Sequence, residues 1–458
     1  MPHNDLLADV LAYATSFLDE LTERPVKWSA TVDELRAALD TPLPDSPSRA
    51  EDVIAELIKS AEAGIVGTTS PRYFGFVIGG AMPAAIAADW LTTTWDQNAG
   101  LFVGGPSASV VEEVSGRWLK EIFGLPSDAS FAFVTGCQMA HFTCLAAARH
   151  HVLAELGWDV EKDGLQGAPK IRILGSAARH DTIDRALRFL GLGTASLIPV
   201  EADDQGRMVA EALRVELANG SGPTIVCAQA GNVNTGSFDP LRAICEISHE
   251  AGAWVHVDGA FGLWAAATES RKALTDGVEL ADSWATDGHK WLNVPYDSGL
   301  AFVAHPQSHR EAMQVHASYL IHSEGDRERD QMDWTPEFSR RARGFTVYAA
   351  MKALGRSGIA EMIDRCCDNA MLFAELLGAE PNVEIVNDVV LNQVLVRFGD
   401  NDDLTRAVVA GVQEDGTCWL SGSNWRGRAV MRVSVSNWAT SEEDVRRSVQ
   451  AILRVVGG

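Results

Sequence analysis

Short apolar segments alternate with helical patterns along much of this chain, and this alternation restricts the possible folds more than any other feature of the sequence. Seven segments have the length and composition of buried strands: residues 131–134, 171–175, 196–200, 224–228, 254–258, 283–287 and 299–304. Helical patterns lie between several of them, at residues 139–156, 181–190, 208–219 and 240–251. Such alternation is typical of a mostly parallel sheet with helices on both faces. The sequence therefore predicts an α/β domain built on a seven-stranded, mostly parallel sheet.

The pattern changes on both sides of this region, which divides the chain into three parts. Residues 1–60 predict two amphipathic helices linked around Pro25, the second of them capped by Ser48. Residues 61–335 form the large domain. Residues 336–458 begin with a long helical pattern and continue with three strand-like runs and two further helices, which predicts a small α+β domain.

Composition and charge exclude several classes of function. The net charge is −24 over 458 residues, which argues against nonspecific binding to nucleic acid or to an anionic membrane. No apolar run approaches the roughly 20 residues needed to span a bilayer, and the N-terminus lacks the pattern of a signal peptide. The seven cysteines show no spacing of a zinc site. We therefore expect a cytoplasmic protein with no membrane span and no metal centre.

One carboxylate and one lysine indicate the chemistry. The apolar run 254–258 ends in Asp258, and a buried parallel strand delivers such a carboxylate to a pocket at its carboxyl end. Lys290 lies in an apolar-flanked turn, where we expect desolvation to lower the pKa of its ammonium group and to free the amine for a Schiff base. A carboxylate and a Schiff-base lysine are the pair that pyridoxal phosphate (PLP) chemistry requires.

Two strand–helix junctions supply further candidates. After the strand 131–134, a tight turn through Thr135, Gly136 and Cys137 leads into a helix, whose free N–H groups and dipole suit a phosphate. Taken by itself this turn is equally compatible with a purely geometric role. His180 lies at another junction, where a structural cap is the simpler interpretation; the alternative is a ring stacked on a planar cofactor.

Asn234 and Arg432 are candidates of a different kind. Asn234 follows the strand 224–228, at the edge where ligands bind in parallel sheets. Asp239, a few residues later, is better explained as a helix cap than as a catalyst. Arg432 stands on a strand, where arginine is usually exposed or salt-bridged; facing a pocket, it would hold a substrate carboxylate in a bidentate manner.

Taken together, the order and spacing of these motifs resemble the group II pyridoxal-dependent decarboxylases, which include aromatic amino-acid, histidine (PLP type) and glutamate decarboxylases. The similarity extends from about Pro71 to Thr440. It is densest in ATDGHKWLNVPYDSG, which looks like the family's lysine motif, and next in HVDGAFG; DWLTTTWDQN and GPSASVVEEVSGRWLKEIFGLP resemble its N-terminal core. The resemblance implies PLP fold type I, the aspartate-aminotransferase-like fold, with PLP as cofactor.

The resemblance also implies roles for the candidate residues. Lys290 would hold PLP as an internal aldimine, and Asp258 would pair with the protonated pyridine nitrogen. His180 would stack on the ring, Ala260 would pack beneath it, and Asn234 is a further cofactor-binding candidate. The phosphate would be bound by Thr135, Gly136, Cys137 and His289.

The implied reaction is decarboxylation of an L-amino acid to the amine and CO₂. In many family members a tyrosine on a mobile loop of the partner subunit protonates Cα, but none of the five tyrosines lies within residues 320–337. The corresponding region carries Gln331, Met332 and Asp333, and the polar segment 322–337 is the best candidate for a mobile loop. His180 or His322 could replace the missing donor. Aldehyde synthesis with oxidative deamination, carbon–carbon lyase chemistry, transamination and a homologue without turnover stay open.

Substrate and assembly rest on apolar side chains. An aromatic group near the N-terminal core comprises Tyr73, Phe74, Phe76, Trp95 and Phe102. Buried packing is its simpler explanation; the alternative is a pocket wall for an aromatic substrate, with Phe76 and Trp95 beside Arg432. The resemblance implies a homodimer, in which a stripe on the first helix would clasp the partner. That stripe consists of Leu6, Leu7, Val10 and Leu11.

Overall fold

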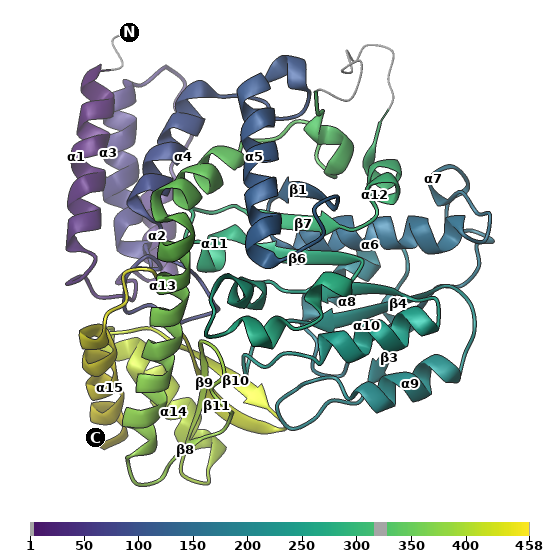
Figure 1. Ribbon diagram of the computed structural model, residues 1–458. Helices are drawn as coiled ribbons and strands as arrows, with labels where there is room; N and C mark the ends of the chain where they lie inside the picture. Colours follow the sequence, from purple (N-terminus) through teal and green to yellow (C-terminus); the bar gives the residue numbers. More distant parts are fainter. Residues whose placement is uncertain (1–3, 316–327, 458) are drawn as a thin grey trace.

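The computed structural model describes residues 4–315 and 328–457 and contains the predicted sheet (Figure 1). Its strands are β1 Ser130–Val134, β2 Arg172–Ser176, β3 Leu197–Val200, β4 Thr224–Gln229, β5 Trp254–Asp258, β6 Ser283–Asp287 and β7 Gly299–Val303. Their order is β1-β7-β6-β5-β4-β2-β3, and β7 alone runs antiparallel to its neighbours. The seven-stranded, mostly parallel sheet is confirmed.

Helices cover both faces of this sheet, because the side chains of its strands point alternately to two apolar cores. In β4, Val226 packs into one core and Ile225 into the other. Helices α6 (Cys137–Ala154) and α8 (Asp181–Phe189) contribute to the core that contains Ile225. Helices α9 (Ala210–Ala218) and α10 (Leu241–Glu250) contribute to the opposite one. Burial on both faces explains why the strands read as continuous apolar runs.

The N-terminal segment differs from its prediction. It holds three helices, α1 (Asn4–Glu20), α2 (Val32–Leu39) and α3 (Ala50–Ala61), where two were expected. The short α2 begins at a capping box between Thr31 and Glu34. The expected cap at Ser48 is wrong, because Arg49 precedes α3 and makes no side-chain capping bond. Two longer helices then lead to the sheet: α4 Pro83–Trp95 and α5 Pro106–Phe123.

The small domain is α+β, as predicted, with a four-stranded antiparallel sheet in the order β10-β11-β9-β8. Its strands are β8 Val383–Ile385, β9 Gln393–Phe398, β10 Ser421–Trp425 and β11 Arg428–Ser434. Helix α13 (Gly344–Gly378) is kinked at Gly355 and runs along both domains in Figure 1; α14 (Asp402–Asp415) and α15 (Glu442–Gly457) follow. The sequence did not predict β10.

Shorter helices connect the larger elements. The α-helical ones are α7 Val160–Asp163, α11 Gly288–Trp291 and α12 Pro306–Met313. The 3₁₀ turns are η1 Glu62–Gly64, η2 Phe102–Gly104, η3 Thr194–Ser196, η4 Gly262–Ala267, η5 Lys272–Thr275, η6 Val278–Leu280 and η7 Gln331–Trp334. No helix in the described residues has the length and hydropathy that a bilayer span requires.

The predicted mobile loop is wrong for its second half. Turn η7 packs into the large domain with Gln331, Met332 and Asp333 buried. The Nε2 of Gln331 donates to the backbone oxygen of Ser109, and Asp333 pairs with Arg310. The first half of the predicted loop, including His322, lies outside the described residues.

Candidate active site

Most of the predicted cofactor residues meet at one cavity of about 230 Å³ at the carboxyl edge of the sheet. Strands β4, β5 and β6 are parallel neighbours, so their ends reach the same edge. The predicted residues that line the cavity are Phe76, Gly136, Cys137, His180, Asp258, Ala260, His289 and Lys290.

Asp258 ends β5 as a buried, ionised carboxylate. Its Oδ1 accepts from the backbone N–H of Ala260 at 3.1 Å, and its Oδ2 lies 3.5 Å from Nε2 of His141. Burial acts to raise the pKa of Asp258, but His141, His180 and Lys290 together hold it well below its ordinary value. This charge state is the one required to oppose a protonated ring nitrogen.

Lys290 lies on α11, directly after β6. Its Nζ is 3.0 Å from Oδ2 of Asp287. Burial lowers the pKa of the Lys290 ammonium group, but Asp287, Cys137 and Asp258 act in the opposite sense, and the net pKa is raised. The predicted lowering is therefore wrong, because a carboxylate three residues earlier outweighs desolvation.

The start of α6 already holds an anionic group. The backbone N–H of Cys137 donates to Oδ1 of Asp287 at 2.6 Å, so this N–H is not free as the sequence led us to expect. Nε2 of His289 lies 3.4 Å from the same oxygen, and the His289 ring stacks on Tyr296 with centroids 4.2 Å apart. A carboxylate seated at this N-terminus is what the helix dipole favours.

His180 has the capping role that was the simpler interpretation, and its stacking role stays a prediction. It is the N-cap of α8: its Nδ1 accepts from the backbone N–H of Thr182 at 3.3 Å. The same ring lines the cavity. Burial lowers the pKa of His180, so the ring is neutral near pH 7, and the proton lies on Nε2 because Nδ1 is an acceptor.

Four predicted residues are not among those that line the cavity: Thr135, Asn234, Trp95 and Arg432. Thr135 immediately precedes Gly136 at its margin. The Oδ1 of Asn234 accepts from the hydroxyl of Ser423 at 2.7 Å, which ties the large domain to the small one. Trp95 is 48% exposed on α4 and packs edge-on against Phe345.

Arg432, on β11, reaches the margin of the cavity. Its Nη1 donates to the backbone oxygen of Val233 at 3.3 Å, and Val233 lines the cavity. Its buried Nε has no acceptor. Burial lowers the pKa of this guanidinium group, and within the described residues no carboxylate pairs with it.

Sequence reasoning missed two glutamines at the cavity, Gln138 and Gln229. Nε2 of Gln138 donates to the backbone oxygen of Thr182 at 3.4 Å, whereas its Oε1 is buried without a partner, as is Nε2 of Gln229. Asp239 was expected to cap α10, but this is wrong: it accepts from the backbone N–H groups of Met208 and Gln229 at 2.7 and 2.8 Å.

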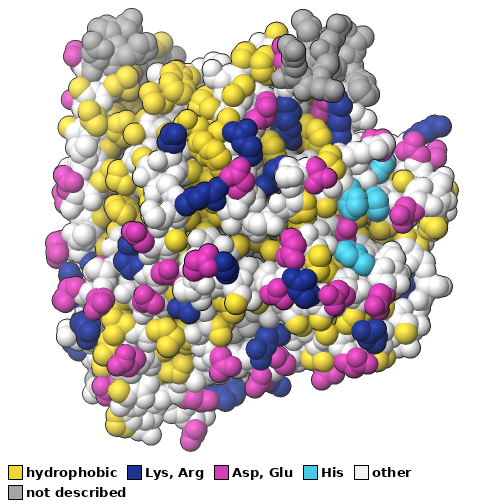
Figure 2. All heavy atoms as spheres, in the orientation of Figure 1, with side chains coloured by type: hydrophobic (Ala, Val, Ile, Leu, Met, Phe, Trp, Pro, Cys, Tyr) yellow, Lys and Arg dark blue, Asp and Glu magenta, His cyan; other side chains and the backbone are white. Residues whose placement is uncertain are grey.

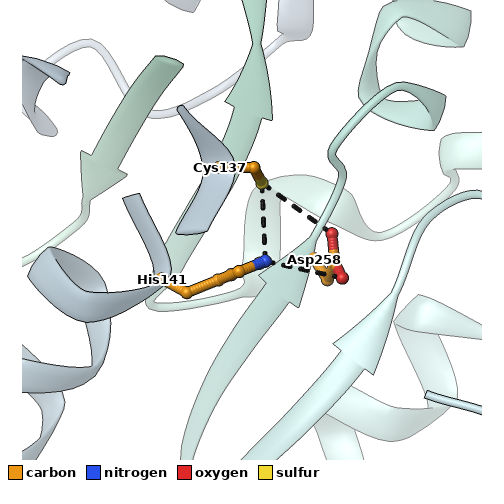
Figure 3. Close-up of side chains that lie close together, drawn as sticks. All are labelled: Cys137, His141 and Asp258. Carbon is orange, nitrogen blue, oxygen red and sulfur yellow. Dashed lines mark hydrogen bonds and ion pairs between the residues drawn. The ribbon is translucent and has the colours of Figure 1, made fainter. Parts of the chain in front are cut away.

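Two further residues were missed, His141 and Asp287. Asp287 stands three positions before Lys290, and His141 stands four positions after Cys137, on the same face of α6. That spacing was the available signal for His141. Among the described residues, one group has ligand atoms near enough to share a metal ion: Cys137, His141 and Asp258 (Figure 3). These atoms already contact one another, so we interpret Cys137 and His141 as residues that hold the carboxylate of Asp258 in place rather than as ligands of a metal ion.

The site fits PLP on grounds independent of the motifs. The unpartnered Nε2 of Gln229 is a donor that a polar ligand would satisfy. The turn before α6 crosses Gly299 so closely that a Cβ there would lie 2.4 Å from the backbone of Gly136, so glycine at 299 is what lets this turn lie against β7 at the margin of the cavity. A lysine, an ionised carboxylate and an imidazole face this space together.

Comparisons with known proteins agree with this geometry. The pyridoxal-dependent decarboxylase conserved domain matches residues 33–398. The chain is 26% identical over 449 residues to the aromatic-L-amino-acid decarboxylase of Bacillus atrophaeus, covering 95% of this chain and 91% of that protein. It is 24% identical over 455 residues to the 4-hydroxyphenylacetaldehyde synthase of Rhodiola rosea, covering 95% and 91%. The structure of Oryza sativa TDC with PLP and tryptamine superposes with a TM-score of 0.92, at 21% identity, covering 100% and 99%.

These matches confirm the predicted fold, the PLP cofactor and the amino-acid decarboxylase class of enzyme. The conserved domain begins within α2, so α1 lies outside it; it then spans α3, the whole seven-stranded sheet and the small domain as far as the end of β9. By this match the chain belongs to the pyridoxal-dependent decarboxylase family.

Proposed function

We propose that this enzyme decarboxylates an aromatic L-amino acid, releasing the amine and CO₂. The observation that carries the proposal is the convergence of Lys290, Asp258 and His180 on one cavity. Bound PLP supplies an electron sink for the pair released at Cα. Lys290 would hold the cofactor, Asp258 would keep its ring nitrogen protonated, and His180 would cover one ring face.

Arg432 would bind the substrate carboxylate. A buried guanidinium group with a free Nε and no carboxylate partner in the described residues has unused donors. Arginine presents these donors in a planar fork that matches a carboxylate. This contact would hold the bond that breaks out of the ring plane, which favours loss of CO₂.

His180 would return the proton to Cα. Its Nδ1 is committed to Thr182, so its Nε2 carries the proton at the cavity. The described part of the predicted loop offers no competing donor from the same chain, because Gln331 and Asp333 are engaged elsewhere. The expected product is therefore the amine.

The aromatic preference rests on the cavity wall and on relatives. Phe76 is 57% exposed, lines the cavity and has a φ of 54°, which is uncommon for an aromatic residue. Such a conformation is kept where a site needs it. The Bacillus atrophaeus relative is an aromatic-L-amino-acid decarboxylase. Phe76 would contact the substrate side chain.

A substrate screen tests the proposal. Purified enzyme with PLP is incubated with each L-amino acid, and products are identified by mass spectrometry. Amine and CO₂ from tryptophan, tyrosine or phenylalanine support it. Turnover confined to acidic or aliphatic amino acids contradicts the aromatic preference. Borohydride reduction followed by peptide mapping must label Lys290, and any other labelled residue would refute the assignment of the lysine.

A second candidate is aldehyde synthesis, in which CO₂ leaves, O₂ takes two electrons from the remaining carbon and becomes hydrogen peroxide, and water displaces the nitrogen as ammonia to give the aldehyde. Two observations favour it: residues 320–337 contain no tyrosine, and a relative of similar length is a 4-hydroxyphenylacetaldehyde synthase. Assaying peroxide and ammonia beside the amine separates the two reactions. H180Q provides a second test, since loss of the donor should shift product from amine towards aldehyde.

We further propose a cytoplasmic homodimer. Exposed apolar side chains gather over the N-terminal helices and α4 in Figure 2, and they include Leu7, Leu11, Trp90, Leu91 and Trp95. A patch of this kind is typical of a surface that binds another chain. All seven cysteines are free and buried, which suits a reducing compartment.

A further inference from the structure

A chain of buried polar side chains continues from Asp258 away from the cavity. Nε2 of His141 lies 3.5 Å from Oδ2 of Asp258 (Figure 3). Behind it, Nδ1 of His141 lies 2.9 Å from Nε2 of His256, and Nδ1 of His256 lies 3.0 Å from Oγ of Ser283. Nε1 of Trp254 donates to the same Oγ at 3.0 Å. Both histidines are fully buried.

Two periodicities place these side chains together. Cys137 and His141 are four residues apart on α6, so they share the helix face that packs on the sheet. Trp254, His256 and Asp258 alternate along β5, so they point to the face that α6 covers. These hydrogen-bonded side chains therefore come from one face of a helix and one face of a strand rather than from a flexible loop.

The hydrogen bonds order the protons along this chain. Burial, followed by the nearby His141, lowers the pKa of His256 to about 3, so His256 is neutral near pH 7. Nε2 of His141 faces the ionised carboxylate of Asp258, which only accepts, so this nitrogen carries a proton and Nδ1 of His141 is the acceptor for Nε2–H of His256. Nδ1 of neutral His256 is then an acceptor as well, and the hydroxyl of Ser283 donates to it.

We propose that His256 and His141 are positioning residues that present a fixed N–H to Asp258 and so keep its carboxylate ionised and aligned for the cofactor. This inference rests on the proposed function of Asp258. The thiol of Cys137, whose pKa is raised by burial, adds a weak donor 4.0 Å from Oδ1. A buried carboxylate needs such donors, because burial without them would favour its neutral form.

The row of hydrogen-bonded side chains from Ser283 through His256 and His141 to Asp258, called the relay below, predicts how strongly each substitution should weaken PLP binding. H141L removes the N–H donor, and we expect PLP to bind about tenfold more weakly. Losses of this size are typical when a residue that hydrogen-bonds to a ligand-binding group is removed. H141Q keeps a donor in reach of the carboxylate and should restore most of that loss. H256L acts only through His141, so it should weaken binding less and should have no further effect in the H141L background.

The matched control is H309L. His309 is also fully buried; its Nδ1 lies 2.8 Å from Oγ of Ser130 and its Nε2 lies 2.9 Å from the backbone oxygen of Trp334. It does not line the cavity, so H309L should leave PLP affinity unchanged. The pH midpoint of the absorption band of bound cofactor should shift in H141L and stay in place in H309L.

Affinity is measured by titrating apoprotein with PLP, with the melting temperature of each variant as a fold check. Unchanged affinity in H141L, or effects of H141L and H256L that add, would overturn the inference while the proposed function stands. A wild-type protein that binds no PLP would overturn both. Should H141L fail to fold, the comparison of H256L with H256L/H141Q decides, since the relay requires H141Q to mask the effect of H256L.

Discussion

The charge balance at Lys290 depends on one neighbouring residue. Desolvation and the carboxylate of Asp287 act in opposite directions on the lysine, and the carboxylate prevails. The amine is therefore held protonated before the cofactor arrives, whereas attack on an aldehyde requires the free base. The same carboxylate also occupies the N-terminus of α6, through the backbone N–H of Cys137.

This balance predicts the behaviour of D287N. Asparagine keeps an oxygen acceptor for Cys137 but removes the charge, so the pKa of Lys290 should fall and PLP should combine with the apoprotein at lower pH. The rate at which PLP combines with the apoprotein is followed by absorbance as a function of pH. The pH at which this rate reaches half its plateau should be at least about one unit lower in D287N than in wild type, which corresponds to about 1.4 kcal/mol of lost charge interaction.

The control for D287N is D282N. Asp282 is also a largely buried carboxylate and accepts from the backbone N–H of Val255, but its partners His249 and His305 lie away from the cavity. D282N should leave the pH profile of PLP incorporation in place. A profile that is identical in wild type and D287N would show that Asp287 does not control the lysine.

Among the helices and strands, the sequence predicted those whose buried side chains form a recognisable apolar pattern along the chain. The seven strands of the large sheet are apolar on both faces, so each was visible as a run. Strand β10, SGSNW, has a mixed burial pattern and pairs through its backbone with β11, so composition did not reveal it. Helix α2 has no buried residue, and only its capping box marked it.

At the site, the same limit applied. Asp258 and Lys290 lie at the ends of apolar runs, where a polar residue stands out in the sequence. The roles of His141 and Gln229 could not be recognised from the sequence, because His141 pairs with Asp258 on a distant element and Gln229 reaches the cavity only once β4 and β5 lie side by side. The position of Asp287, three residues before Lys290, is plain in the sequence. Its effect on the pKa of Lys290 depends on the distance between its carboxylate and Nζ of Lys290, which only the structure gives.

The kink in α13 is a prediction at the scale of an element. Gly355 has φ 62° and ψ −178°, a conformation that is essentially restricted to glycine. No atom lies within 4 Å of a Cβ added there, so the cost of G355A would come from the backbone alone. We expect G355A to lower the free energy of unfolding by about 1–3 kcal/mol.

The comparison is with G358A in the same helix. Gly358 has no positive φ, and an added Cβ would be in tight contact with Leu354 alone, whose Cβ and Cδ2 would lie 3.3 Å away. Alanine should therefore be neutral or stabilising there, because it limits the unfolded chain. Urea unfolding of both variants measures the difference. Equal stabilities would mean that α13 straightens without cost.

For the whole molecule, the proposed dimer predicts a response to charge on α1. Leu7 is 63% exposed and Leu11 is 47% exposed, one helical turn apart. Buried at an interface, two glutamates would be desolvated without partners, so L7E/L11E should shift the protein to monomers in light scattering. V215E alters a similarly exposed residue on α9 and should leave the mass unchanged. A dimer that persists in L7E/L11E would place the interface elsewhere.

Acidification should destabilise the whole fold through its buried histidines. Burial lowers the pKa of His256 and His309 to about 3 from the ordinary histidine value of 6.5. Between these values the unfolded chain binds a proton that the folded chain does not, so each histidine contributes stability above pH 6.5 that is lost as the pH falls towards 3. The loss is about 1.4 kcal/mol per pH unit for each.

Histidines on the surface oppose this trend. Histidine side chains gather on the face shown in Figure 2. A hydrogen bond to Asp282 raises the pKa of one partly exposed histidine, His249. Its contribution is complete below pH 6.5 and is lost as the pH rises through the raised value. Because His249 is partly exposed, its contribution is the smaller one. The fold should therefore be less stable at pH 5 than at pH 7.

The variant H309L isolates one buried group. Urea unfolding of the apoprotein at pH 7 and pH 5 gives the change in unfolding free energy between the two conditions for each protein. Between pH 6.5 and pH 5, about 1.5 pH units, the unfolded chain protonates His309 and the folded chain does not. The change in unfolding free energy should therefore be smaller by about 2 kcal/mol in H309L than in wild type. In H249Q it should instead become larger, since a group that stabilises the fold at acidic pH is lost. A pH dependence that H309L leaves unaltered would mean that this histidine takes up its proton without unfolding the chain.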